Sequence, residues 1–302
     1  MTDTAAINAG SLDAGSLDAG SIDTATIVTD IAAALKARSV VPYVGPGAFA
    51  LLPEADCPIP RNSAELAQRL NAKVAAPGRI RSQLTAVAQF IESRRHRKTL
   101  DTILNEIFRR EAPATPVHAW LATLPAPALI VDVWYDNVLE SLLSSETARL
   151  WGQIQGLSHP QGAGEWVKHY APDGSEVTAE AAAGWDTVLY KPSGSASPAG
   201  NYLISDSDFV EILTEIDIQT PIPPVVQERR TGKNFLYLGC RFDQEIQRTF
   251  GRQIAKRSSD KHWAVIEGEL SKNEARFLEQ HNITRLDLPL AEAIRQIGEA
   301  MA

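Results

Sequence analysis

The chain has 302 residues, a formal net charge of −8 and a pI near 5.3, which argues against binding to the phosphate backbone of nucleic acids. Its two cysteines, Cys57 and Cys240, are too few for a four-cysteine zinc site, so we expect no metal, and they fit a reducing compartment. No segment has the length and apolar character of a membrane span, and the N-terminus lacks a secretory pattern. We therefore expect a cytoplasmic protein without a membrane partner.

The first 24 residues are low in sequence complexity. The sequence Ala-Gly-Ser-Leu-Asp occurs at 9–13 and 14–18, and 19–23 repeats it with Ile22 in place of leucine. Such small residues, with one carboxylate per unit, bury too little area to offset the entropy lost on ordering. We predict a disordered tail over residues 1–24. A docking segment that a protein partner orders is the alternative.

From residue 25 onward, strand patterns alternate with helix patterns. Short apolar runs typical of buried strands lie at 40–44, 128–131, 186–190, 234–238, 262–266 and 284–286. Amphipathic stretches typical of helices lie at 26–37, 63–74, 83–91, 100–108, 205–216, 242–254, 271–281 and 290–301. This alternation predicts one α/β domain over residues 25–302, a doubly wound, Rossmann-like parallel sheet with helices on both faces.

Two segments interrupt the alternation. Several helix patterns follow one another at about 62–112, which predicts a helical insertion. Residues 151–185 mix glycine, serine, alanine and aromatic residues without a clear period. We expect an irregular insertion there, either a small subdomain or a lid.

The first strand ends in the turn Gly45-Pro46-Gly47. Glycine at such a turn lets the backbone bend sharply and lets a ligand approach the main chain. Asn62 and Glu65 then form a capping box that begins a helix. A strand, a glycine turn and a helix are typical of a nucleotide phosphate site, although a plain turn that ends the strand is the alternative.

Polar or glycine-rich motifs follow three later strands. They are Trp134-Tyr135-Asp136, Ser193-Gly194-Ser195 and Gly239-Cys240-Arg241. Since ligands bind outside the carboxyl ends of the strands in open parallel sheets, we expect these motifs to line one pocket.

The order of these motifs resembles the sirtuin-like NAD-binding family, in particular its divergent bacterial branch, over about residues 40–291. That branch has a Gly-Ala-Gly turn, a Thr-Thr-Asn-Tyr-Asp segment before Leu-Glu, a Lys-x-His-Gly strand end, and a Phe-Leu-x-x-Gly strand followed by Arg and Asp. The matching segments here are Gly45-Pro46-Gly47, 132–136 before Leu139-Glu140, 191–194, and 235–239 before Arg241 and Asp243.

Two departures from the family pattern affect its chemistry. In the family an asparagine orients NAD and, in hydrolases, the attacking water, while a histidine is the general base toward the ribose hydroxyls. Trp134 and Ser193 hold these two positions here. An indole donates one N–H and accepts nothing, and serine has no pKa suited to proton transfer near neutrality. Pro46 also lacks the N–H that alanine would offer to a phosphate.

The resemblance therefore leaves three functions open. The first is a catalytically degenerate protein that binds NAD or ADP-ribose and acts as a sensor, adaptor or assembly component with a protein partner. The second is an active NAD hydrolase in which Asp136 works with His169 or Glu165 from the 151–185 segment. The third is a structural interaction protein without a nucleotide, in which Trp134 fills the nicotinamide end of the pocket.

The resemblance also implies where a nucleotide would lie. We expect its phosphates at the backbone of Gly45, Gly47 and Ala48, and its adenosine ribose along Gly239, Cys240 and Arg241. Trp134, Asp136 and Ser193 complete the predicted site, which has no assigned catalytic residue. For two of these residues a structural role is the alternative: Arg241 as a salt-bridge arginine and Cys240 as a small buried residue.

Overall fold

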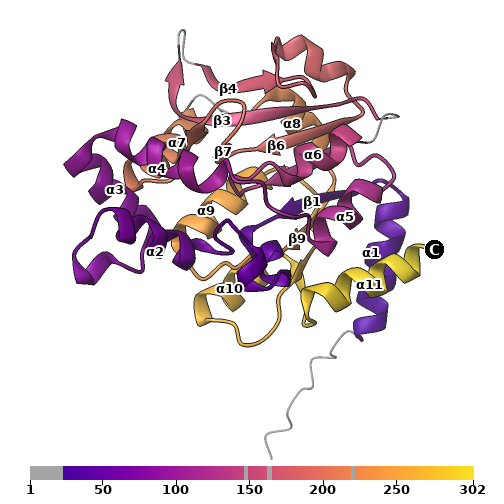
Figure 1. Ribbon diagram of the computed structural model, residues 1–302. Coiled ribbons are helices and arrows are strands. Elements are labelled where there is room, and N and C mark those ends of the chain that lie inside the picture. Colours follow the sequence, from indigo (N-terminus) through magenta and orange to yellow (C-terminus); the bar gives the residue numbers. More distant parts are fainter. Residues whose placement is uncertain (1–22, 146–148, 162–164, 219–221) are drawn as a thin grey trace, which may run out of the picture.

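The computed structural model describes residues 23–145, 149–161, 165–218 and 222–302. The strands of its main sheet are β1 Val40–Val44, β2 Leu129–Asp132, β3 Trp151–Gln161, β4 Glu165–Tyr170, β5 Glu176–Val177, β6 Thr187–Lys191, β9 Asn234–Leu238, β10 His262–Val265 and β11 Ile283–Leu286. They lie in the order β11-β10-β9-β1-β2-β6-β3-β4-β5 (Figure 1), and β7 Gly194–Ser195 pairs with β8 Asn201–Tyr202 in a second, two-stranded sheet. Every neighbouring pair from β11 to β3 is parallel, whereas β4 and β5 are antiparallel additions. The predicted α/β fold is confirmed.

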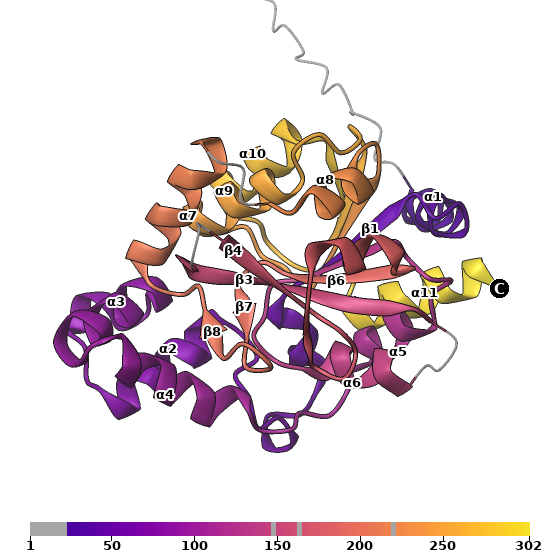
Figure 2. The same cartoon turned by 90° about the horizontal axis from the view of Figure 1, so that it is seen from above.

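Helices cover both faces of this sheet (Figure 2). One layer contains α1 Thr24–Lys36, α5 Pro116–Thr123, α6 Val138–Ser145 and α11 Leu290–Met301, and the other contains α7 Asp206–Ile218, α8 Pro224–Arg230, α9 Glu245–Ile254 and α10 Lys272–Gln280. Successive side chains of β1 alternate between the layers: Val40 and Val44 pack with the first, Val41 and Tyr43 with the second. Because both faces are covered, this strand is buried along its whole length.

The helical insertion contains α2 Ser63–Lys73, α3 Leu84–Arg95 and α4 Arg97–Phe108. Asn62 caps α2, since its side chain accepts a hydrogen bond of 2.9 Å from the backbone N–H of Glu65, as the sequence predicts. The apolar faces of the three helices form their own hydrophobic cluster, which includes Trp134 and Tyr135 from the end of β2. The insertion is thus packed directly onto a strand end of the sheet.

The prediction of an irregular insertion at 151–185 is wrong for most of that segment. β3 pairs in parallel with β6, and β4 pairs with β3. The strand has no period-two pattern because residues 151–158 are all buried, including Gln153 and Gln155, whose amides bond each other at 2.7 Å. Its glycines are also a packing requirement: a Cβ at Gly152 would lie 2.3 Å from the Trp185 ring.

The predicted tail over residues 1–24 falls outside the described residues except for its last two positions, and α1 begins at Thr24. Within the described parts of the chain, no helix combines the length and the apolar character that crossing a bilayer requires.

Candidate functional site

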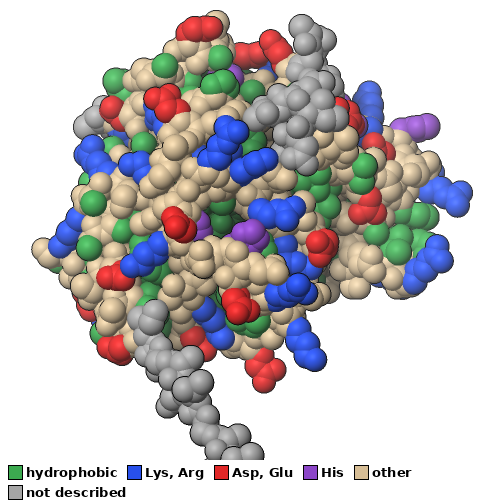
Figure 3. All heavy atoms as spheres, turned by 180° about the vertical axis from the view of Figure 1, so that it is seen from behind, with side chains coloured by type: hydrophobic (Ala, Val, Ile, Leu, Met, Phe, Trp, Pro, Cys, Tyr) green, Lys and Arg blue, Asp and Glu red, His purple; other side chains and the backbone are tan. Residues whose placement is uncertain are grey.

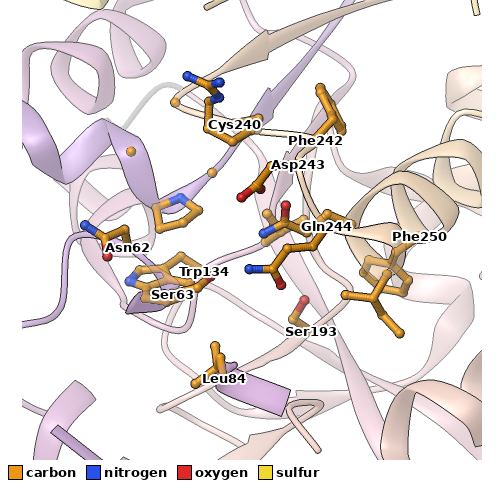
Figure 4. Close-up of a pocket in the computed structure, with 18 of the residues that line it drawn as sticks. Asn62, Ser63, Leu84, Trp134, Ser193, Cys240, Phe242, Asp243, Gln244 and Phe250 are labelled. Atoms are coloured by element: carbon orange, nitrogen blue, oxygen red, sulfur yellow. The ribbon is translucent and has the colours of Figure 1, made fainter. Parts of the chain in front are cut away.

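A cavity of about 330 Å³ lies at the carboxyl ends of β1, β2, β6 and β9 (Figure 4). This volume is near the lower end of the range for small-molecule sites, roughly 300–1,000 Å³. The predicted site residues that line it are Gly45, Gly47, Trp134, Ser193, Gly239, Cys240 and Arg241. Ala48 and Asp136 are buried outside it.

Main-chain hydrogen bonds join the two glycine turns at one side of the cavity. Gly45 N–H donates to the Leu238 carbonyl at 2.9 Å, and Gly47 N–H donates to the Gly239 carbonyl at 2.9 Å. Ala48 N–H donates to the Gly45 carbonyl at 3.1 Å. Because Pro46 has no N–H, this turn has no free main-chain donor for a phosphate, contrary to the position we expected for it.

The glycines themselves are explained by this contact. A Cβ at Gly45 or at Gly47 would lie 2.7 Å from the Gly239 carbonyl oxygen. At Gly239, where φ is +64°, a Cβ would lie 2.3 Å from the backbone nitrogen of Ala48. The glycine pattern, which suggests the close approach of a ligand, is therefore explained by the close approach of two backbone turns.

Trp134 forms a buried wall of the cavity and is 4% exposed. Its indole Nε1 donates to the Pro60 carbonyl at 3.0 Å, and its ring meets Phe108 edge-on at 5.5 Å between centroids. The single polar group of the indole is thus used to fasten the segment before α2. It has no group left that could orient water or a carboxamide.

Ser193 occupies the position at which the family pattern has a histidine. Its hydroxyl makes no hydrogen bond with another described residue, and Figure 4 shows it with Asp243 and Gln244 around the space between Trp134 and Phe250. Among the described residues that line the cavity there is no histidine, and Arg241 and Asp243 are the charged ones.

Arg241 lines the cavity, but its guanidinium is directed to Glu274 on α10. Nε lies 2.9 Å from Oε1 and Nη2 lies 2.7 Å from Oε2, while Phe242 N–H also donates to Oε1 at 2.8 Å. Burial raises the pKa of Glu274, but these hydrogen bonds outweigh it and leave the pKa below its ordinary value. The geometry of Arg241 thus matches its alternative role as a salt-bridge arginine. Cys240 also matches its alternative role, since it is a small buried residue, and burial raises the pKa of its thiol.

Residues 128–286, more than half of the chain, match the family model of the SIR2-like domain. The chain belongs to the SIR2-like family. The match begins next to β2 and ends with β11, so it includes Trp134, Ser193 and Gly239 but not the first glycine turn. A search of the curated proteins gives no match. Membership in this family supports an NAD-related function.

Beneath the cavity, the SIR2-like protein buries a cluster of charges that the sequence motifs contain but that we did not predict as a unit. Lys191 Nζ lies 2.6 Å from Asp132 Oδ2 and 3.6 Å from Glu140 Oε1, and it donates to the Asp136 carbonyl at 2.7 Å. Burial is the main cause that raises the pKa of Glu140 to about 8 and that of Asp132 to about 6.

This cluster fixes the two strand ends that carry the substituted residues. Asp132 Oδ1 accepts a hydrogen bond of 3.0 Å from Trp134 N–H, while Lys191 lies two residues before Ser193. Asp136 accepts from Val138 N–H at 3.0 Å and is 2% exposed. In this SIR2-like protein the cluster therefore joins the two strand ends that carry Trp134 and Ser193.

The cavity also contains polar groups that the motifs did not indicate. The N-terminus of α2 contributes Asn62 and Ser63, and α9 contributes Gln247. With its amide oriented to donate, the Gln247 side-chain nitrogen lies 3.0 Å from Asp243 Oδ1. Only the Asn62 cap could be found from the sequence, because the reach of α2 to this edge depends on the tertiary fold. Within the described chain, no group of three or more His, Cys, Asp or Glu could hold a metal ion.

Proposed function

We propose that this SIR2-like protein binds an NAD- or ADP-ribose-type nucleotide in the cavity without cleaving it, and acts as a sensor, adaptor or assembly component. One observation carries the proposal. Trp134 and Ser193 both line the cavity, at the positions where the family pattern has an asparagine and a histidine.

The residues at these positions cannot supply the family chemistry. The Ser193 hydroxyl is no acceptor for a ribose proton near neutral pH, and the Trp134 N–H is bonded to the Pro60 carbonyl. Each acid–base or positioning group is worth about 10²–10⁴ in rate, and groups that act as a unit lose most of that rate together. Turnover is therefore expected to be abolished, whereas the fold that forms the cavity is intact.

The remaining groups fit a nucleotide. The backbone N–H groups of Ser63 and Ala64 begin α2, make no hydrogen bond with the described residues, and face a cavity where the helix dipole favours a phosphate. The Asp243 carboxylate can accept from ribose hydroxyls, and Leu84 and Phe209 offer apolar area for a ring. Since the Trp134 indole takes space at the carboxamide position, ADP-ribose should bind at least as tightly as NAD.

Isothermal titration with ADP-ribose, NAD and nicotinamide tests the proposal. We expect binding of ADP-ribose, equal or weaker binding of NAD, and none of nicotinamide. Asp243→Ala should weaken ADP-ribose binding by about tenfold, the loss of one charge-assisted hydrogen bond. Asp56→Ala removes an exposed carboxylate outside the cavity and is the matched control.

The two other functions predict different results. An NAD hydrolase would release nicotinamide from NAD, and Asp136→Ala would abolish that release. The residues that this function requires, Asp136, His169 and Glu165, do not line the cavity. An interaction protein without a nucleotide would show neither heat of binding nor a shift in melting temperature with ADP-ribose.

A further inference from the structure

A second concave surface lies between α9 and α10, at the amino ends of β10 and β11. Two adjoining cavities of about 480 and 250 Å³ share Arg252, Phe277, Gln280 and His281, so they form one groove, which we name the α9–α10 groove. Figure 3 shows this face of the molecule, with lysine and arginine side chains around histidines near its centre. α9 separates the groove from the nucleotide cavity, because Gln247 and Phe250 face the latter.

The groove is basic although the whole chain carries a net charge of −8. Its basic lining residues other than histidine are Arg248, Arg252, Lys256, Arg257 and Arg276, and its acidic ones are Glu245 and Asp260. Arg248 is neutralised by Glu245 at 2.7 Å. Within the described residues, the guanidinium groups of Arg252, Arg257 and Arg276 have neither an ion pair nor a hydrogen bond. Three guanidinium groups of the groove thus have no counter-ion in the described part of the chain, and Asp260 is the acidic lining residue left to offset their charge.

The neighbouring His281 shows the effect of this charge. Burial and then the charge of Arg252 lower the pKa of His281, and burial is the main cause that lowers the pKa of His262. An anion placed between these groups would relieve the repulsion that now disfavours the charged form of His281.

A buried amide also lines the groove without a partner. Gln253 is 9% exposed, and its Oε1 has no hydrogen bond with the described residues. A buried polar group left without a partner destabilises the folded state. Such an acceptor next to unpaired arginines points to a ligand that provides both negative charge and a hydrogen-bond donor.

We infer that the α9–α10 groove binds a small anion with two or more linked phosphates, the chemistry of pyrophosphate or of a nucleoside diphosphate. Three unpaired guanidiniums match several negative charges, and the planar fork of each matches the oxygens of a phosphate. The unpartnered Gln253 Oε1 is an acceptor, so within this ligand class it favours a nucleoside diphosphate, whose sugar hydroxyl can donate to it. An extended nucleic acid is the less favoured occupant, because the net charge of the chain would repel it beyond the groove.

Titration of the full chain with inorganic pyrophosphate tests this inference, with sulfate at the same ionic strength as the reference anion. Arg252→Gln and Arg276→Gln should each weaken pyrophosphate binding at least tenfold. Arg79→Gln makes the same change at an exposed arginine outside the groove and should leave binding unaltered. Asp243→Ala, which alters only the nucleotide cavity, should also leave it unaltered, so that failure at either site is distinguishable.

The inference is overturned if pyrophosphate gives no heat with the wild-type chain, or if it binds no more tightly than sulfate. Equal affinities of Arg252→Gln, Arg276→Gln and Arg79→Gln would overturn it as well. As an independent readout, the NMR titration of His281 should give a higher pKa in the presence of pyrophosphate, and an unchanged pKa contradicts a ligand in the groove. Melting curves of each variant establish that it is folded.

Discussion

The carboxyl edge of the sheet has two halves that are held in opposite ways. At β1 and β9, the turns of Gly45, Gly47 and Gly239 pack backbone against backbone, without side chains or charge. At β2 and β6, the ion pair of Asp132 and Lys191 lies wholly inside the protein. One half is positioned by steric fit and main-chain hydrogen bonds, and the other by buried electrostatics.

The difference separates the parts of the site that serve the fold from the parts that would decide its chemistry. Both supports serve the fold, so they do not depend on whether the proposed loss of catalysis holds. The side chains that project from those supports toward the cavity are Trp134 and Ser193. The largest effects on stability should therefore come from the supports, and the effects on chemistry from the projecting residues.

Lys191→Met should give the largest loss of stability. It leaves the Asp132 carboxylate buried without its cation, which costs about 3–5 kcal/mol. Chemical denaturation measures this free energy of unfolding. Lys168→Met breaks a partly exposed ion pair with Glu176 and should cost less than about 1 kcal/mol, so equal losses in the two variants would show that the cluster is not a support.

Gly239→Ala should be next, with a loss of about 2–4 kcal/mol from the left-handed backbone and the clash with Ala48. Gly232 separates the two causes, since its φ is +67° but nothing lies within 4 Å of a Cβ there. Gly232→Ala should cost only about 1–2 kcal/mol. Equal costs at both positions would mean that the contact between the two turns contributes nothing.

The charged half should also make stability depend on pH. The pKa of Glu140 rises on folding from about 4.5 to about 8, so the folded state holds more protons between these values. The stabilisation that protonated Glu140 provides is complete below a pH of about 4.5 and is lost as the pH rises through about 8. Denaturation from pH 5 to 8 should show wild-type stability falling relative to Glu140→Gln by on the order of 2 kcal/mol. Parallel curves would contradict the raised pKa.

Trp134→Phe should have the smallest effect, a loss of about 1–2 kcal/mol with the hydrogen bond to the Pro60 carbonyl. Trp120 is a half-buried tryptophan on α5 whose indole N–H has no hydrogen bond with the described residues. Trp120→Phe should therefore cost less. The two melting temperatures measure the difference, and a larger loss at Trp120 would contradict an anchoring role for Trp134.

The sequence predicts those parts of the molecule that depend on local pattern. Strands such as 40–44 and 234–238 have apolar runs, and the Asn62 cap has a short-range signal. β3 was missed because it is buried on both faces and contains packing glycines, which remove any period. The strand ends meet at one edge as expected, but the arrival of Ser63 and Asp243 there depends on tertiary packing.

Release of nicotinamide from NAD by the purified wild-type protein tests the central claim most directly. It should be measured at an NAD concentration that titration shows to be saturating. The account predicts a bound nucleotide and no release above the rate without protein. Release by the wild-type chain, and its loss on a substitution within the cavity, would contradict the claim that Trp134 and Ser193 abolish the chemistry.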